Sequence, residues 1–344
     1  MVLNKILQNS DLTREEIIYL LSLQDEGDIQ KLYNRADEIR EKYFGDEVHL
    51  RGIIDFSNHC SQNCLYCGLR QENIMLQRYR MTAEEIISTA KQITNLGIYT
   101  IVLQSGEDAI YDTDLVAYLI YTIKQKSNAA VTLSLGERGF DEYRTWKIAG
   151  ADRYLLNYET SNPKLYSVYR LNHSLEERIN HLNFLKSIGF QIGSGNIVGL
   201  PMQTIEDIAD DILICKELNL DMASFNPFLP ALNTPYKGKQ SAGLKLTLKA
   251  MAVARIVLKN VHIPATIALT NLVDNGRILG LNAGANIVMP DYTPSPYREK
   301  NLIYADKESV IKSSKDSRTC LEVEIESIGR RISSSRGDSL KSAT

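Results

Sequence analysis

Apolar and polar positions follow two alternating patterns from residue 48 onward. Short apolar runs, typical of buried strands, alternate with longer stretches in which apolar residues recur every three or four positions, as on a helix. The predicted strands span residues 48–56, 100–103, 130–135, 153–158, 191–198, 222–229, 263–269 and 285–289. Helices are predicted between them at 82–97, 111–126, 141–149, 174–189, 204–218, 245–259 and in a short segment from about residue 273.

This succession of eight β-α units shows no linker-like break. It predicts an α/β fold of the (β/α)8, TIM-barrel type, because a doubly wound open sheet, the competing architecture, rarely repeats the unit so often without interruption. Barrel enzymes build their sites at the carboxyl ends of the strands. The informative polar residues are therefore expected directly after each apolar run.

The flanks of the predicted barrel (48–298) differ from it in pattern. Residues 1–47 read as an N-terminal helical cap, with a capping box at Thr13–Glu16 and a helical pattern over 28–43. Residues 299–330 are predicted to form a C-terminal helical extension. Residues 331–344 are polar and rich in serine, so we expect a disordered tail there.

Composition narrows the function classes. The chain has 344 residues, 44% hydrophobic and 24% charged, as in a globular protein, and a net charge of −3, which gives no electrostatic footprint for nucleic acid. We expect no membrane partner, because no apolar run is long enough to span a bilayer. The N-terminus is too polar for a signal peptide. These features predict a cytoplasmic protein.

Three of the five cysteines, Cys60, Cys64 and Cys67, lie in one short loop with the spacing C-x3-C-x2-C, directly after the first predicted strand. Three thiolates can hold three irons of a [4Fe–4S] cube and leave the fourth iron open, unlike ferredoxins, which fill all four positions. The spacing is that of the radical S-adenosylmethionine (SAM) enzymes, and an oxygen-sensitive cluster would point to anaerobic life. A zinc site with His59 as fourth ligand is the alternative, but the paired C-x2-C halves of structural zinc sites are lacking.

Polar residues do follow the later strands. Gln104, Ser105 and Gly106 form a turn of mostly small residues that can present its backbone to a zwitterionic ligand, or serve as an ordinary turn. Glu159 can bind ribose hydroxyls or an ammonium, or cap a helix. Arg178 can reach a carboxylate, or lie exposed on its helix. The glycines around Ile197 allow an adenine to pack against the backbone, although a plain turn explains them almost as well.

Over about residues 10–330 the chain resembles the HydE family, the radical SAM maturases of [FeFe]-hydrogenase. The stretches that carry this resemblance are Gln104-Ser-Gly-Glu-Asp108, Thr132-Leu-Ser-Leu-Gly-Glu137 and Thr293-Pro-Ser-Pro-Tyr-Arg298. Other segments, such as Ser174 to Arg178, are shared with the related biotin synthase and methylornithine synthase families, so they do not discriminate.

The resemblance implies roles for single residues. Cys60, Cys64 and Cys67 would ligate a [4Fe–4S] cluster. The SAM contacts would be Tyr66, Gln104, Ser105, Gly106, Glu159, Arg178 and Ile197. Thr132, Ser134 and Asn157 would line the substrate space, where small hydroxyls and a neutral amide suit a compact iron–cysteine carbonyl/cyanide precursor better than lysine. A flavodoxin- or ferredoxin-type electron donor and the other hydrogenase maturases are the implied partners.

Two departures from the family pattern leave alternatives open. Asn157 stands where the family has an arginine beside the active site, and only Cys320 remains of three C-terminal cysteines that hold a second cluster in some members. A methylornithine synthase-like mutase, a HydE paralogue with another substrate, and a non-enzymatic zinc or Fe–S binding module are therefore the other hypotheses.

Overall fold

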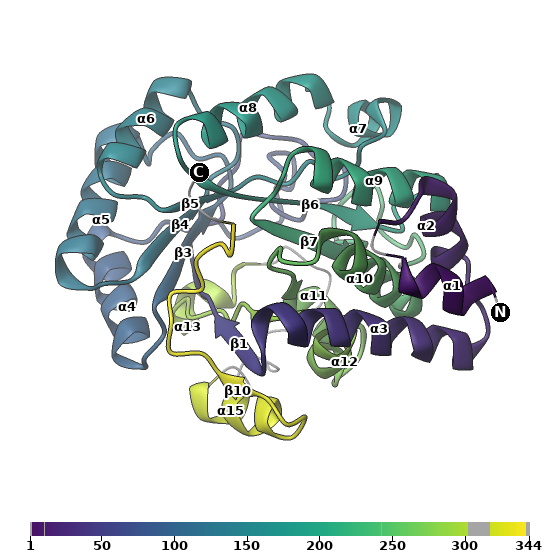
Figure 1. The fold of residues 1–344 in the computed structure, drawn as a ribbon. Helices are drawn as coiled ribbons and strands as arrows, with labels where there is room; N and C mark the ends of the chain where they lie inside the picture. Colours follow the sequence, from purple (N-terminus) through teal and green to yellow (C-terminus); the bar gives the residue numbers. More distant parts are fainter. Residues whose placement is uncertain (1, 10, 242, 302–316, 342–344) are drawn as a thin grey trace.

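The computed structural model describes residues 2–9, 11–241, 243–301 and 317–341 (Figure 1). Three helices, α1 (Val2–Gln8), α2 (Arg14–Leu21) and α3 (Glu26–Phe44), precede the first strand. Thr13 caps α2 through the predicted box with Glu16. The apolar faces of α2 and α3 pack against α9 (Ile205–Glu217) and α10 (Leu244–Leu258), so this segment covers one side of the barrel.

All strand pairs are parallel. One sheet has the order β2-β3-β4-β5-β6-β7 and the other the order β10-β1-β9-β8. Their bounds are β1 (Glu47–Leu50), β2 (Gly52–Ser57), β3 (Thr100–Ser105), β4 (Ala130–Ser134), β5 (Arg153–Leu155), β6 (Gln191–Val198), β7 (Met222–Pro227), β8 (Pro264–Ala265), β9 (Ile287–Val288) and β10 (Arg331–Ile332). Parallel pairing follows from the helical crossover between consecutive strands.

Isolated parallel bridges join the two sheets on both sides. Ile53 of β2 pairs with Asp291 beyond β9, and Met222 of β7 pairs with His262 ahead of β8. Arg51 links β1 and β2 into one continuous strand, because its N–H donates to the carbonyl of Val288. With β1 and β2 counted as one strand, the described strands other than β10, which pairs only with β1, form a ring of eight, as the sequence predicts.

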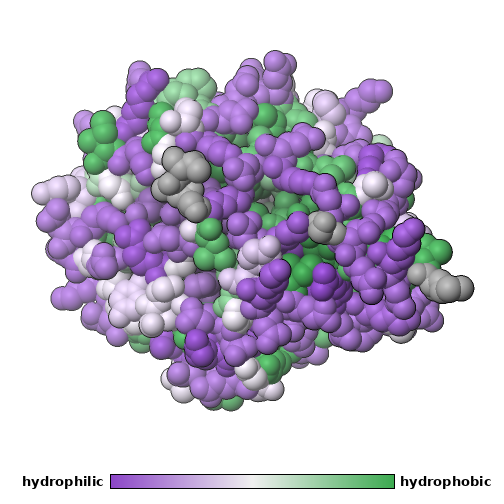
Figure 2. Space-filling model, viewed as in Figure 1, coloured by the Kyte–Doolittle hydropathy of each residue, from purple (hydrophilic) through white to green (hydrophobic). Residues whose placement is uncertain are grey.

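Helices surround this ring (Figure 1). Beyond α9 and α10 they are α4 (Ala83–Asn95), α5 (Thr113–Lys126), α6 (Phe140–Ile148), α7 (Pro163–Tyr169), α8 (Leu175–Ser187), α11 (Ile267–Leu272), α12 (Gly276–Asn282), α13 (Ser295–Arg298) and α15 (Arg318–Glu326). Capping boxes at Thr82 and Ser174 start α4 and α8. Figure 2 shows a mostly hydrophilic face with apolar side chains in small groups. No helix in the described part of the chain has the length and apolarity needed to cross a membrane.

Two sequence predictions differ from the structure. The predicted strand 263–269 is strand only at Pro264–Ala265, and α11 begins at Ile267. A short apolar run fits a strand or a buried helix equally well by periodicity alone, and here Thr266 takes the N-cap position. The short helix α7 was not predicted; Asn162 caps it, and Pro163 occupies its first turn.

The prediction of a disordered tail over 331–344 is wrong for residues 331–341. β10 pairs with β1, and the chain then runs across the barrel toward β5, as the yellow segment in Figure 1 shows. Polar composition suggested disorder because the segment has little to bury. Its stability comes from hydrogen bonds and ion pairs with distant residues, which no local pattern reveals. Residues 342–344, and 302–316 of the predicted extension, lie outside the described residues.

Candidate active site

The three cysteines of the motif lie in the loop between β2 and α4, at the carboxyl end of the strands. None of the five cysteines forms a disulfide. The sulfur of Cys60 accepts hydrogen bonds from the backbone N–H groups of Gln62 and Glu107, both at 3.4 Å. Burial raises the pKa of the Cys60 and Cys64 thiols, and that of Cys67 still further. Without a bound cation the three thiols therefore stay protonated at neutral pH.

The turn after β3 packs directly onto the cysteine loop. A Cβ atom on Gly106 would lie 2.3 Å from the carbonyl oxygen of His59 and 2.6 Å from the Cβ of Cys60. The backbone N–H of Ser61 donates to the carbonyl of Glu107, which fixes the same contact from the other side. The predicted segment Gln104–Gly106 is thus brought against the metal-binding motif, although Gln104 itself donates to Asp55 at 2.7 Å.

A series of polar side chains connects the cysteine loop to the ends of β4 and α7. Glu137 contacts Arg178 at 2.8 Å and His173 at 3.2 Å. His173 in turn bonds Gln62, whose amide donates to Glu107. Burial alone would raise the pKa of Glu137, but the charges of Arg178, Arg170 and His173 outweigh it and lower that pKa below its ordinary value. The network fixes the loop without using a cysteine.

Two arginines in this region keep unused donors. Arg178 is almost fully buried, and one of its terminal nitrogens has no hydrogen-bond partner. Arg170 contacts Glu107 at 3.4 Å, while its buried Nε also lacks a partner. Orphaned buried donors of this kind are rare in folded proteins. Their position beside the cysteine loop suits a ligand that carries a carboxylate.

Glu159 lies at the same end of the barrel, in the left-handed backbone region with φ of 65°. Such a conformation is uncommon for residues other than glycine and often marks a functional site. Burial raises the pKa of Glu159, opposed by Arg170 and Arg178 and by a hydrogen bond with Tyr66. The structure thereby brings three predicted SAM contacts, Tyr66, Glu159 and Arg178, into one neighbourhood.

An apolar group of side chains lies next to this carboxylate. Tyr66 and Ile197 both pack against a group of buried residues from α7 and from the loops after β6 and β7, namely Leu165, Tyr169, Leu200 and Phe228. The backbone N–H of Ile197 donates to the carbonyl of Glu159. Two predicted SAM contacts therefore pack against the same apolar group, although 131 positions in the sequence separate them.

The predicted substrate residues face the interior of the barrel. On β4, Val131 and Leu133 belong to the core beneath the helices, so the alternation of the strand turns Thr132 and Ser134 inward. Asn157 follows β5 on the inward side and accepts a hydrogen bond from Ser224 at 3.3 Å. The hydroxyl of Thr132 is buried and has no partner. These three residues share the lumen.

Three further polar residues of the site were missed by the sequence analysis. Arg51 and Asp55 interrupt the first apolar run, which was the available signal, and Arg170 gave none. Arg51 is buried with an unpartnered Nε. Asp55 accepts hydrogen bonds from Gln104 and Asn301, and burial together with the nearby Asp291 raises its pKa to about 8.

The donor set fits an iron–sulfur cube better than a single ion. Among the described residues, no three His, Cys, Asp or Glu side chains converge as a site for one metal ion. A cube does not need such convergence, because each thiolate binds its own iron. Three free thiols on one loop, together with the orphaned donors of Arg170 and Arg178, suit a cluster with one open iron and a zwitterionic ligand.

Comparison with known proteins identifies the family. Residues 54–214 match the radical SAM superfamily. The chain is 47% identical over 325 residues to the [FeFe] hydrogenase maturase subunit HydE of Thermotoga maritima, covering 94% of this chain and 93% of that protein. The chain belongs to the HydE family of radical SAM proteins. Members of this superfamily use a [4Fe–4S] cluster and SAM, so the cofactors implied by the sequence are confirmed at the level of the family.

Other relatives of this HydE-family chain are more distant. The 3-methylornithine synthase of Methanosarcina barkeri is 30% identical over 301 residues, which is 86% of this chain and 84% of that protein. The crystal structure of methylornithine synthase (PylB) has a TM-score of 0.84 and 26% identity, with 97% of each chain covered. The parallel α/β fold is therefore confirmed by a solved structure, and the sequence relationship to HydE is the stronger of the two.

Proposed function

We propose that this protein is a HydE-type radical SAM enzyme that acts on an iron–cysteine carbonyl/cyanide precursor during assembly of the [FeFe]-hydrogenase active site. The observation that carries the proposal is the identity of 47% to HydE over nearly the whole chain. The arrangement of the cysteine loop beside Glu159 and Arg178 is consistent with it. The cluster with bound SAM supplies one-electron cleavage of the sulfonium, which yields a 5′-deoxyadenosyl radical.

Different residues of this chain bind the cluster and SAM. Cys60, Cys64 and Cys67 hold the cluster. The free donor of Arg178 binds the carboxylate of SAM in a charge-assisted contact. Glu159 binds the polar groups of the same ligand.

The remaining SAM contacts are made by two groups of residues. The turn of Gln104, Ser105 and Gly106 holds the methionyl end through its backbone, because the side chain of Gln104 is engaged by Asp55. Tyr66 supports the adenine through its backbone and Ile197 packs against it, beside the buried apolar side chains that both residues already contact.

The lumen then selects the substrate. Thr132, Ser134 and Asn157 offer hydroxyls and an amide but no fixed charge. Gly195 of β6 allows a close approach to Ser224 of β7 at this level, because a Cβ atom there would lie 2.0 Å from the carbonyl oxygen of Ser224. The hydroxyls and amide of these three residues suit a compact organometallic complex better than lysine, whose two ammonium groups and carboxylate would need charged partners there.

The test is anaerobic turnover of the reconstituted protein with each candidate substrate. With the iron–cysteine precursor we expect productive SAM cleavage, and mass spectrometry and EPR detect the transfer of 5′-deoxyadenosine and the iron product. With lysine we expect no methylornithine. Alanine at Cys60, Cys64 or Cys67 should abolish iron binding. The matched controls Cys215→Ala and Cys320→Ala should retain it, because Cys215 is buried in α9 and Cys320 is exposed on α15.

Each contrary result has a distinct meaning. Methylornithine formed from lysine would overturn the HydE assignment in favour of a mutase. Inactivity with both substrates, with SAM cleavage intact, would indicate a paralogue, and Asn157 would be the first position to exchange for arginine. Stoichiometric zinc without iron in anaerobically prepared protein would contradict the enzyme hypothesis altogether.

Turnover also requires a protein that donates the electron and a protein that receives the product. We propose a flavodoxin- or ferredoxin-type donor, because the cluster must be reduced before SAM is cleaved. The other hydrogenase maturases are the proposed partners that supply the precursor and receive the product. Both proposals are tested by replacing the chemical reductant with each purified protein and measuring the rate of 5′-deoxyadenosine formation.

A further inference from the structure

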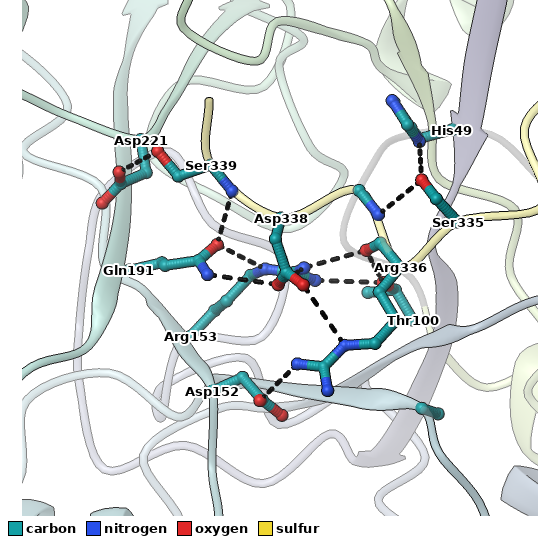
Figure 3. Close-up of polar contacts among 12 residues, drawn as sticks. His49, Thr100, Asp152, Arg153, Gln191, Asp221, Ser335, Arg336, Asp338 and Ser339 are labelled. Atoms are coloured by element: carbon teal, nitrogen blue, oxygen red, sulfur yellow. Dashed lines mark hydrogen bonds and ion pairs between the residues drawn. The ribbon is translucent and has the colours of Figure 1, made fainter. Parts of the chain in front are cut away.

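Residues 333–341, which we name the floor segment, lie across the amino-terminal ends of the barrel strands, opposite the cysteine loop. Figure 3 shows this segment reaching residues at the start of several strands. Ser335 contacts His49 of β1 at 3.4 Å, and Ser339 donates to Asp221, which directly precedes β7. The floor segment is the part of the chain that the sequence analysis had assigned to a disordered tail.

The contacts of the floor segment converge on Arg153, the first residue of β5. The guanidinium of Arg153 lies 2.6 Å from the carboxylate of Asp338 and donates to the carbonyl of Arg336 at 2.8 Å. It also donates to Thr100 and Gln191, the first residues of β3 and β6, at 3.0 Å each. Every nitrogen of this buried side chain therefore has a partner, and the floor segment supplies half of them.

Further bonds attach the segment on both sides of Arg153. Arg336 pairs with Asp152 at 2.5 Å, and that carboxylate also accepts from the backbone of Val131. The carbonyl of Asp338 lies 3.1 Å from the ring nitrogen Nε2 of His262, ahead of β8. The segment thus bridges strand starts around most of the ring, which is the geometry of a closure rather than of a terminus lying on the surface.

A cavity lies on the inner side of the same residues. It is small, about 10 Å³, which is room for about one water molecule, and it lies between β4, β5, β6 and β7. Arg51, Arg153, Gln191 and Asp221 line it and also bond to the floor segment. Its wall includes Thr132, one of the three proposed substrate residues. The residues that hold the floor segment therefore belong to the lower wall of the lumen.

We propose that the floor segment completes the reaction chamber from below and that Asp338 is a positioning residue, which holds Arg153 in the wall of the lumen. The second half rests on the proposed function. Radical chemistry needs a chamber closed to solvent, and an open (β/α)8 barrel has two ends. The proposed SAM site occupies the carboxyl end, so the amino-terminal end needs a separate closure.

Charge explains why an acidic residue is required in this segment. Arg51 and Arg153 are both buried, and the hydrogen bonds of Arg51 go to the sulfur of Met222 and the carbonyl of Gly337. Unpaired guanidiniums are costly to bury, and like charges repel each other. Asp338 compensates Arg153 directly, and its removal would leave two cations facing the cavity. We expect Arg153 then to turn away from the lumen toward water.

The test compares Asp338→Asn with Asp338→Glu and with Asp141→Asn, all in the full-length, cluster-loaded protein. Asp141 pairs with Arg144 on the exposed surface of α6, so its substitution is the same chemical change without a buried partner. Hydrogen exchange followed by mass spectrometry reports closure independently of activity. We expect exchange at the starts of β5 and β6 about tenfold faster in Asp338→Asn, as for loss of one charge-assisted contact, and unchanged in Asp141→Asn.

Two kinetic readouts separate positioning from closure. For Asp338→Asn we expect KM for the iron–cysteine precursor to rise about tenfold with the dissociation constant of SAM unchanged, and Asp338→Glu to restore KM. We also expect more 5′-deoxyadenosine released without added substrate. This second measurement needs only SAM cleavage, so it remains informative if the proposed substrate is wrong.

The outcomes are decisive in both directions. Unchanged exchange at β5 and β6 in Asp338→Asn, and in a chain ending at residue 332, would overturn the closure. Faster exchange with unaltered KM, in protein that turns over the precursor, would overturn the positioning role of Asp338. Failure of every variant and of the wild type to use the precursor would instead count against the proposed function and leave the exchange result to decide the closure.

Discussion

Gly106 and His59 are in contact through their backbones, although they belong to the ends of two different strands. A Cβ atom on Gly106 would lie 2.3 Å from the carbonyl oxygen of His59, far inside any normal separation. The backbone of the β3 turn therefore forms one wall of the cysteine loop. The position of Cys60, the next residue, depends on this contact.

Gly106→Ala should consequently displace the cysteine loop. We expect a loss of about 1–3 kcal/mol in the free energy of unfolding, as for overpacked sites, and loss of most of the bound iron after reconstitution. Iron analysis and urea unfolding measure the two effects. Gly243→Ala is the matched control, because no atom lies within 4 Å of a Cβ there. Equal iron in both variants would show that the loop tolerates a wider turn.

Thr132→Val separates stability from substrate binding. The Thr132 hydroxyl is buried without a hydrogen-bond partner, and valine has nearly the same shape. We therefore expect the free energy of unfolding to stay equal or to rise by about 1 kcal/mol. If the hydroxyl binds the substrate, KM for the iron–cysteine precursor should rise while SAM cleavage without substrate stays at the wild-type rate. An unaltered KM would remove Thr132 from the substrate site.

Glu159→Gln and Arg178→Ala should weaken SAM binding while the cluster survives. Loss of one charge-assisted contact costs about 1.5–3 kcal/mol, or about 10- to 150-fold in the dissociation constant. Arg178 also pairs with Glu137 at 2.8 Å, so Glu137→Gln is the control that breaks this pair and keeps the guanidinium. Anaerobic calorimetric titration with SAM should show near wild-type affinity for the control. Comparable weakening in all three variants would indicate a structural role for Arg178.

His49, which lies against the floor segment, should make the free energy of unfolding depend on pH. Burial and then the charge of Arg51 and Arg153 lower its pKa to about 4, against the opposing charges of Glu47 and Asp338. Because the folded-state pKa lies below the unfolded value of 6.5, the unfolded chain takes up the proton first. The stabilisation is complete above pH 6.5 and is lost as the pH falls toward 4.

His49→Asn should reduce this dependence. Between pH 7.5 and pH 5 the wild type should lose about 2 kcal/mol more of its free energy of unfolding than the variant. Urea unfolding at both pH values measures the difference. The same comparison in a His262→Asn background removes the contribution of the neighbouring His262, whose pKa burial also lowers. Parallel losses in the two proteins would contradict the assignment of the effect to His49.

Local pattern determined much of this molecule from the sequence alone. The alternation of strands and helices gave the barrel, because the period of apolar residues reports directly on backbone geometry. The spacing of Cys60, Cys64 and Cys67 gave the metal chemistry, since ligands within one loop need no tertiary contact to be recognised. The carboxyl ends of the strands indicated where the proposed cofactor residues come together, because in a parallel barrel those ends must meet.

Only the tertiary structure decided the contacts between residues far apart in the chain. Arg178 has Glu137 as its partner, and Arg153 has Asp338, and neither pairing leaves a local signal because each side chain alone resembles an exposed charge. The ordered tail shows the difference most clearly. Its polar residues bury no apolar surface of their own, so their order depends on carboxylates, guanidiniums and carbonyls that folding has already assembled at the other end of the barrel.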